Sequence, residues 1–286
     1  MTSGTLAPPR LLGEVLSVTV QRLQRAGLPN AEAEAKELVA RAGGRDRKLL
    51  DLHRSEPWST ASDVLLQAHL LQRLNHVPLA YLLGEWDFLD MTLTVTPDVL
   101  IPRPETEDLF HWMAQDGAFA GEVVDVGTGA GGLALALARQ WPAARVTAID
   151  LSAAALAVAR WNGRRQGVES RIAFRQADLL EKMAPRSMDK IVANLPYVAT
   201  SDLEELTPEV LKEPRHALDG GPDGLSVIRR LVPQAFETLR AGGALYLEVG
   251  QGQAPAVEHV LTQAGFSEVT KSRDFAGIER FIRGIR

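Results

Sequence analysis

The tetrapeptide Asn194-Leu195-Pro196-Tyr197 combines groups that could hold a planar amine. Asn194 offers a side-chain carbonyl oxygen as a hydrogen-bond acceptor. Pro196 restricts Leu195 to an extended conformation, which can point the Leu195 carbonyl in one direction. Tyr197 adds a flat aromatic face. Two acceptors and a stacking ring suit an NH2 group, so the motif predicts an amine site. A strand-ending turn with a surface tyrosine is the alternative.

A site of this kind favours transfer of a methyl group to nitrogen. An amide nitrogen is a poor nucleophile because its lone pair is delocalised. Accepting both of its hydrogens returns electron density to the nitrogen, and alignment with an electrophilic carbon lowers the barrier further. The electrophile that fits is the sulfonium methyl group of S-adenosyl-L-methionine, and no general base is needed before attack.

A glycine-rich loop precedes this motif, in the stretch DVGTGAGG at residues 125–132. Gly127, Gly129 and Gly131 let the chain turn tightly and let a ligand approach the backbone. Asp150 closes the following strand and can accept the hydroxyl hydrogens of a ribose. Gly127, Gly129 and Gly132 also match the spacing typical of NAD sites, so the loop alone leaves both cofactors open. We find no histidine or lysine placed for hydride transfer, which disfavours an oxidoreductase.

The elements that must position these motifs alternate between strand and helix from residue 121 onward. The pattern predicts strands over 122–126, 145–149, 171–175, 189–193, 243–249, 266–270 and 278–284. It predicts helices over 131–140, 152–166, 224–240 and 253–264. This alternation is typical of an α/β fold with a doubly wound, mostly parallel sheet of seven strands. The last two strands are joined by too few residues for a crossover, so we expect the last strand to be antiparallel.

The first part of the chain has a different pattern. Apolar residues at helical spacing predict helices over 11–26, 31–42 and 60–75, and the strict alternation of MTLTV at 91–95 predicts a strand. We therefore divide the chain into an all-α domain at 1–77, a hairpin linker at 78–103 and a catalytic domain at 104–286. The first nine or so residues are expected to be disordered.

Composition narrows the function further. The 286 residues carry a net charge of −5 without a broad basic region, so we expect no direct binding of nucleic acid. The chain has no cysteine, and its six histidines lack metal-ligand spacing, so we expect no metal site. No signal peptide and no apolar run long enough for a membrane span are present, which favours a cytoplasmic protein.

Several segments together resemble one family. The loop GTGAG, Asp150 and NLPY are similar to class I S-adenosylmethionine-dependent methyltransferases that modify amino groups. The stretches PLAYLLGEWDF, VLIPRPETE, EPRHALDGGPDGL, LYLEVGQGQ and RDFAGIERF narrow the resemblance to the release factor glutamine methyltransferases of the HemK/PrmC type, over residues 75–283. The resemblance implies methylation of the glutamine side chain in the Gly-Gly-Gln motif of peptide chain release factors, with S-adenosyl-L-homocysteine as the second product. It also implies that the helical domain helps to dock the release factor.

The resemblance also implies roles for individual residues. Those implied to bind the cofactor are Gly127, Thr128, Gly129, Ala130, Gly131, Asp150, Asp178, Leu179 and Asn194. Those implied to bind the glutamine are Asn194, Leu195, Pro196 and Tyr197, and we expect Asn194, Pro196 and Tyr197 to act in catalysis. Two positions depart from the family pattern. Leu195 stands where proline is usual, and Leu179 stands where an aromatic residue would stack on adenine.

Leu195 keeps a second substrate open, because NLPY also resembles the tetrapeptide of adenine dimethyltransferases that act on RNA. An adenine-N6 methyltransferase shares the chemistry of a planar NH2 group but usually has a basic groove. A non-catalytic binding module is a further alternative. Elsewhere, Arg103 is expected either to make a substrate or interdomain contact or to pair with Glu105 or Glu107. Glu248, at the end of a strand, is expected either to support the site through hydrogen bonds or to cap a nearby loop.

Overall fold

The computed structural model describes residues 10–286, so the expected disorder of the first nine residues lies outside the described chain. These residues form two compact units, and the division falls between Gly84 and Glu85. The linker expected over 78–103 is therefore split between the two units. Each unit is described by itself below.

The first unit is helical. It contains α1 (Leu12–Arg25), α2 (Ala31–Gly43), the 3-10 helix η1 (Arg47–His53), α3 (Thr60–Leu74) and the short α4 (Leu79–Leu83). The three helices expected here are confirmed, whereas η1 and α4 were not predicted because each is too short to show a clear apolar period. No helix within residues 10–286 is long and apolar enough to cross a membrane.

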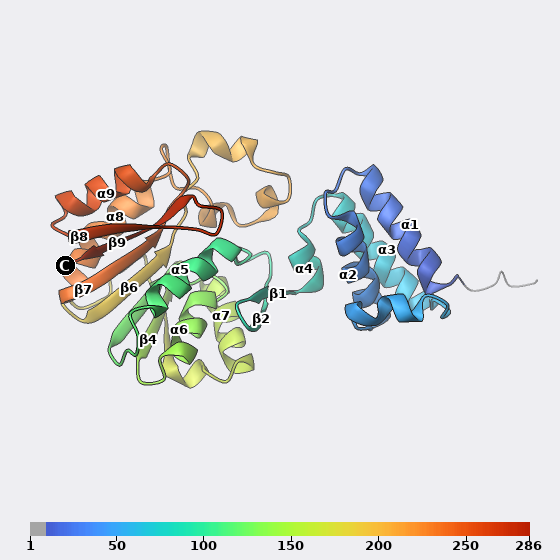
Figure 1. Ribbon diagram of the computed structural model, residues 1–286, viewed down its shortest axis with the longest axis horizontal. Helices are drawn as coiled ribbons and strands as arrows, with labels where there is room; N and C mark the ends of the chain where they lie inside the picture. Colours follow the sequence, from blue (N-terminus) through green and yellow to red (C-terminus); the bar gives the residue numbers. More distant parts are fainter. Residues whose placement is uncertain (1–9) are drawn as a thin grey trace, which may run out of the picture. The chain divides into compact units, whose positions relative to one another are not determined.

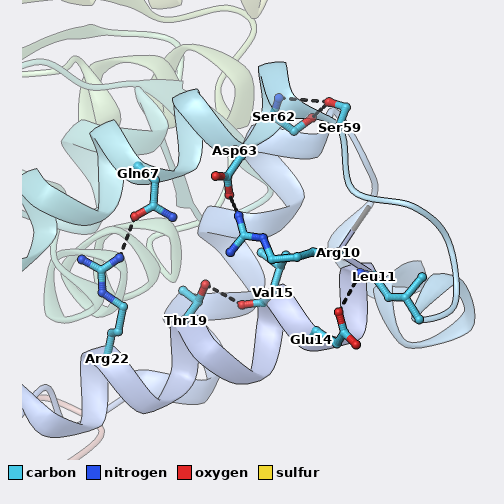
Figure 2. A network of polar contacts seen from close by, with 10 residues as sticks. All are labelled: Arg10, Leu11, Glu14, Val15, Thr19, Arg22, Ser59, Ser62, Asp63 and Gln67. Atoms are coloured by element: carbon cyan, nitrogen blue, oxygen red, sulfur yellow. Dashed lines mark hydrogen bonds and ion pairs between the residues drawn. The ribbon is translucent and has the colours of Figure 1, made fainter. Parts of the chain in front are cut away.

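Polar contacts tie the helices of this unit together (Figure 2). The Ser59 hydroxyl accepts a hydrogen bond of 3.0 Å from the Ser62 amide and so caps the start of α3. Arg22 of α1 donates to Gln67 of α3 at 2.6 Å. Beneath the surface, Arg73 and Glu34 form a bidentate ion pair at 2.6 and 3.1 Å. This pair joins α3 to α2 inside the apolar cluster of the unit.

The second unit begins with an antiparallel hairpin of β1 (Glu85–Phe88) and β2 (Met91–Thr94). Phe88, Met91 and Leu93 are buried in the same apolar cluster as the helix α6 (Gly132–Gln140). The hairpin is thus part of the core of this unit. Its assignment to a linker is corrected, because three of its side chains point inward and lose their exposed surface.

A seven-stranded sheet forms the centre of the second unit (Figure 1). Its strands are β3 (Glu122–Val126), β4 (Arg145–Asp150), β5 (Ile172–Gln176), β6 (Met188–Asn194), β7 (Leu239–Glu248), β8 (Ser267–Arg273) and β9 (Glu279–Ile285). Their order across the sheet is β5-β4-β3-β6-β7-β9-β8, and β9 runs antiparallel to both neighbours. The doubly wound α/β fold and its antiparallel last strand are confirmed.

Helices cover both faces of the sheet. Figure 1 shows α5 (Pro104–Ala114), α6 and α7 (Ala153–Arg165) on one side, and α8 (Ser226–Thr238) and α9 (Ala254–Gln263) on the other. Successive residues of β3 pack on opposite faces, since Val123 belongs to one apolar cluster and Val124 to the other. A strand buried on both faces lacks strict alternation, which explains why the adjacent residues Val123 and Val124 are both apolar.

Candidate active site

The sheet brings the two sequence motifs together at one edge. Val126 of β3 pairs with Ile149 of β4 on one side and with Ala193 of β6 on the other. The glycine turn and Asn194 therefore leave the sheet side by side, at the carboxyl ends of neighbouring parallel strands. In folds of this class the crevice at this place is the usual ligand site.

A cleft of about 840 Å³, counted to its open mouth, lies at this edge. Residues from both motifs line it, together with apolar side chains from the loops around them. The lining residues that sequence analysis had singled out are Gly127, Gly129, Asp150, Asp178, Leu179, Asn194, Leu195 and Pro196. A cleft lined mainly by apolar groups with a few convergent polar ones is typical of small-molecule and cofactor sites.

The glycine turn forms the floor of the cleft. The Gly127 amide donates to the Ile149 carbonyl at 2.8 Å, and its φ of +76° favours glycine. A Cβ at this position would lie 3.0 Å from Leu195 Cδ2. Gly131 does not line the cleft, and a Cβ there would lie 3.1 Å from Ala159 Cβ. We infer that Gly131 allows α6 and α7 to approach each other.

Asp150 is fixed in position at the end of β4. Its Oδ2 accepts from the Gly129 amide at 2.9 Å and its Oδ1 from the Ser152 amide at 2.8 Å. Asp150 as a residue is only 9% exposed, yet it lines the cleft. Each carboxylate oxygen can accept more than one hydrogen bond, so both remain able to accept from a ribose diol.

Apolar side chains and one ion pair line the cleft together with Asp150. Ile149, Ala177 and Leu179 contribute apolar surface that suits a flat ring such as adenine. Leu179 adopts φ of +54°, which is uncommon for a residue with a side chain. Asp178 is held by an ion pair of 2.5 Å with Arg230, and both residues line the cleft.

Asn194 is oriented by a chain of two hydrogen bonds. Its Nδ2 donates to the Thr106 hydroxyl at 2.9 Å, and that hydroxyl donates to Glu248 Oε2 at 2.7 Å. Because the NH2 end of the amide faces Thr106, the carbonyl oxygen Oδ1 is the end left for a ligand. The acceptor predicted from the sequence is therefore available at the end of β6.

The other residues of the tetrapeptide lie differently. The Leu195 side chain is buried in the core beneath Gly127 and is 5% exposed. Strand β6 ends at Asn194, which leaves the Leu195 carbonyl beyond the sheet ladder. Pro196 lines the cleft, whereas Tyr197 is half-buried and is not one of the lining residues. Burial raises the pKa of the Tyr197 phenol to about 12, so the phenol is neutral.

A second, smaller hollow adjoins the cleft. It is lined by Thr128, Ala130, Arg103 and Thr106, among others, and shares Gly127, Gly129 and Asn194 with the first. Two compartments thus meet at Asn194. This arrangement can place two reacting groups on either side of one side chain.

Two buried carboxyl groups, those of Glu248 and Asp125, form hydrogen bonds with residues of the site. Burial raises the pKa of Glu248 to about 7 and that of Asp125 to about 7. Asp125 accepts from the Thr128 hydroxyl at 2.7 Å and from the Ala134 amide at 3.1 Å, so it joins the glycine turn to α6. Of the two roles considered for Glu248, the structure shows a hydrogen bond that its Oε2 accepts from the Thr106 hydroxyl at 2.7 Å.

Sequence analysis missed two partners. Thr106 was not singled out, although it lies in the noted stretch IPRPETE, at the proline-initiated start of α5. Arg103 was expected to pair with Glu105 or Glu107 or to contact substrate, but its partner is Glu213, at 2.6 Å. Glu213 also accepts from the Ile101 amide at 3.0 Å. Its location in a loop more than a hundred residues away gave no local signal.

Comparisons with known proteins agree with this geometry. Residues 105–276 match the family model "Methyltransferase small domain", and residues 14–84 match "PrmC N-terminal domain". A methyltransferase structure from Pyrococcus furiosus superposes with a TM-score of 0.54 at 18% identity, covering 77% of this chain and 96% of that one. At that identity the likeness supports the fold alone.

Two curated relatives match nearly the whole chain. The release factor glutamine methyltransferase of Geobacter sulfurreducens is 38% identical over 272 residues, which cover 95% of each chain. That of Bordetella pertussis is 41% identical over 263 residues, covering 90% of this chain and 95% of the relative. Identity at this level over both units, joined to a methyltransferase fold, shows that the chain belongs to the release factor glutamine methyltransferase family.

Proposed function

We propose that this enzyme transfers a methyl group from S-adenosyl-L-methionine to the side-chain nitrogen of the glutamine in the Gly-Gly-Gln motif of peptide chain release factors. The observation that carries the proposal is the junction of two compartments at Asn194, whose carbonyl oxygen is free to accept from the substrate amide. Family membership supplies the identity of the substrate.

The residues of the larger cleft fit the cofactor. The fixed Asp150 carboxylate suits the ribose hydroxyls, and the apolar walls at Ile149 and Leu179 suit the adenine ring. Both Gly127 and Gly129 line the cleft, and Gly129 leaves the backbone open toward the methionine portion because nothing lies within 4 Å of its Cβ position. When bound, S-adenosyl-L-methionine supplies an electrophilic methyl group. We assign the adenine edge to Asp178 and Leu179, and the smaller hollow's Thr128 and Ala130 to the methionine side.

The protein's part in the reaction is to hold the substrate nitrogen. In our proposal Asn194 Oδ1 and the Leu195 carbonyl accept the two hydrogens of the glutamine amide, which opposes delocalisation of its lone pair. Pro196 keeps the Leu195 carbonyl in place, and Tyr197 bounds the pocket. Attack by this nitrogen forms its bond to the methyl group as the sulfur–methyl bond breaks, which leaves S-adenosyl-L-homocysteine. The positively charged nitrogen then loses a proton to solvent. Orientation and acceptor placement account for the rate gain.

The departure at Leu195 does not disturb this scheme. The proposed hydrogen bond uses the main-chain carbonyl, which every residue has. The side chain instead fills the core under Gly127, and a leucine there removes apolar surface from water. The residue type at 195 therefore bears on packing more than on recognition of the amide.

We also propose that the enzyme acts on a protein in the cytoplasm, where release factors function, without binding nucleic acid directly. The net charge of −5 and the apolar, glycine-lined cleft support this assignment. Incubation with labelled cofactor and either purified release factor or RNA tests it. Labelling of RNA in place of the release factor would favour the adenine-N6 alternative.

The central experiment is co-expression with a release factor, followed by mass spectrometry of the peptide that contains Gly-Gly-Gln. We expect one added methyl group on the glutamine with the wild-type enzyme. Asn194→Ala should reduce the rate by about a hundredfold or more, because one of two positioned acceptors is lost. The exposed Asn75→Ala, in the helical unit, is the matched control and should retain full activity.

Cofactor titration by calorimetry shows whether the Asn194→Ala protein is still folded and binds. Near-normal turnover by a folded Asn194→Ala enzyme would refute the role of Asn194. No methyl group on the release factor with wild-type enzyme would refute the proposed substrate.

A further inference from the structure

The orientation of the Asn194 amide decides whether it can accept or must donate. Its oxygen and its NH2 group have nearly the same shape, so rotation by half a turn exchanges an acceptor for a donor in the same place. A donor facing the substrate NH2 would repel it. The proposed chemistry therefore requires a device that prevents this rotation.

The hydrogen bonds from Asn194 to Thr106 and from Thr106 to Glu248 fix which end of the Asn194 amide faces Thr106. Thr106 has one hydroxyl hydrogen, and that hydrogen is donated to Glu248 Oε2 at 2.7 Å. The Thr106 oxygen can then only accept, and it accepts from Asn194 Nδ2 at 2.9 Å. A rotated amide would place two oxygens against each other with no hydrogen between them.

Burial protects this arrangement from exchange with water. Thr106 is 7% exposed and Glu248 is 1% exposed, so neither partner is readily replaced by solvent. The second oxygen of Glu248, Oε1, is buried and has no hydrogen-bond partner among residues 10–286. If Glu248 carries a proton on Oε1, its Oε2 is still an acceptor. The Thr106 hydroxyl therefore donates to Oε2 both when Glu248 is charged and when it is protonated on Oε1.

The fold explains why these three residues meet. Asn194 and Glu248 are paired neighbours at the ends of β6 and β7. Thr106 lies in the first turn of α5, which Pro104 begins. The helix thus places one hydroxyl between the ends of two adjacent strands, against the side of Asn194 opposite to its carbonyl oxygen.

We propose that Thr106, backed by Glu248, is a positioning residue that sets the orientation of the Asn194 amide and so keeps its oxygen toward the substrate nitrogen. This inference rests on the proposed function. Thr106 acts through Asn194, and its effect is on the rate of methyl transfer.

The variants Thr106→Val and Thr106→Ser test it. Valine keeps the shape of threonine but has no hydroxyl, whereas serine keeps the hydroxyl. We expect Thr106→Val to lower kcat roughly tenfold or more, the loss of a directed hydrogen bond, with KM for cofactor and for release factor changed less than threefold. Thr106→Ser should recover most of the rate. The buried Thr147→Val, on β4 and away from the cleft, is the matched control and should leave kcat unchanged.

A double-mutant cycle separates positioning from a general loss of structure. In the Asn194→Ala background, Thr106→Val should have little further effect on the single-turnover rate, because the amide that it orients is absent. A merely structural role would lower the rate equally in both backgrounds. That additive result would overturn the inference, as would a Thr106→Val enzyme with wild-type kcat.

The same experiment distinguishes failure of the inference from failure of the proposed function. If wild-type enzyme does not methylate the release factor, the proposed function fails and the inference with it. If wild-type enzyme is active and the cycle is additive, only the inference fails. Calorimetric titration with S-adenosyl-L-homocysteine confirms that each variant remains folded.

Discussion

Replacing Glu248 with glutamine should make the stability of the catalytic unit less dependent on pH. Burial raises the pKa of this carboxyl from 4.5 to about 7 in the folded protein. The folded state therefore binds a proton more readily than the unfolded state. The stabilisation from this proton is fully present below pH 4.5 and is lost as the pH rises through about 7.

The size of the effect follows from the same values. A pKa raised from 4.5 to about 7 corresponds to roughly 3 kcal/mol of unfolding free energy. About 2.5 kcal/mol of this should be lost between pH 5 and pH 8. Glutamine does not titrate, so the variant should keep that amount. Asp125, whose pKa burial also raises, is present in both proteins and cancels in the comparison.

Urea unfolding at pH 5 and pH 8, followed by tryptophan fluorescence, measures the difference. Four of the five tryptophans lie in residues 85–286, so the signal reports mainly on the catalytic unit. Glu237→Gln, at an exposed position on α8, is the control and should behave as wild type. If wild type and Glu248→Gln lose equal stability over this interval, the Glu248 carboxylate is solvated in the folded protein. Our account of Thr106 and Glu248 as buried partners of Asn194 would then be wrong.

Four further changes test other parts of the structure. Gly127→Ala should lower cofactor affinity at least tenfold in calorimetry, because residue 127 has a positive φ and its Cβ would lie 3.0 Å from Leu195 Cδ2. Unchanged binding would show that the turn tolerates a side chain at this position. Asp150→Asn should weaken binding of S-adenosyl-L-homocysteine roughly ten- to a hundredfold, because a charged acceptor for the ribose is lost. Leu195→Ala should cost about 2–3 kcal/mol in urea unfolding while kcat changes little, and a large fall in kcat would show that the side chain contacts substrate. Arg73→Ala should destabilise the helical unit by about 3 kcal/mol, because Glu34 would remain buried without its partner, and a smaller loss in thermal unfolding would indicate that water replaces the arginine.

Sequence patterns predicted the sheet well because local residues determine it. The valine-rich stretch at residues 122–126 lies between two glycines and matches β3 at both ends. The antiparallel last strand followed from the short connection before it, which is a simple limit on chain length. The positions of Gly127, Asp150 and Asn194 at one edge followed from the parallel strand order.

Other features depend on contacts between distant segments. Thr106 meets Asn194 across 88 positions of the chain, and no local pattern marks one threonine in a helix as a partner of a strand end. The inward direction of the Leu195 side chain depends on how the chain turns after β6. The hairpin alternates like an ordinary exposed ribbon, and only its packing on α6 shows that it belongs to the core.

The buried hairpin has a consequence for how the two halves of such a protein can be recombined. Phe88 and Leu93 pack against Gly132 and its neighbours in α6. The hairpin that follows the helical unit in the sequence is therefore part of the hydrophobic core of the methyltransferase unit. A graft that replaces the helical unit with another must join upstream of residue 85. A graft joined at residue 104 would remove the cover from α6 and expose its leucines to solvent.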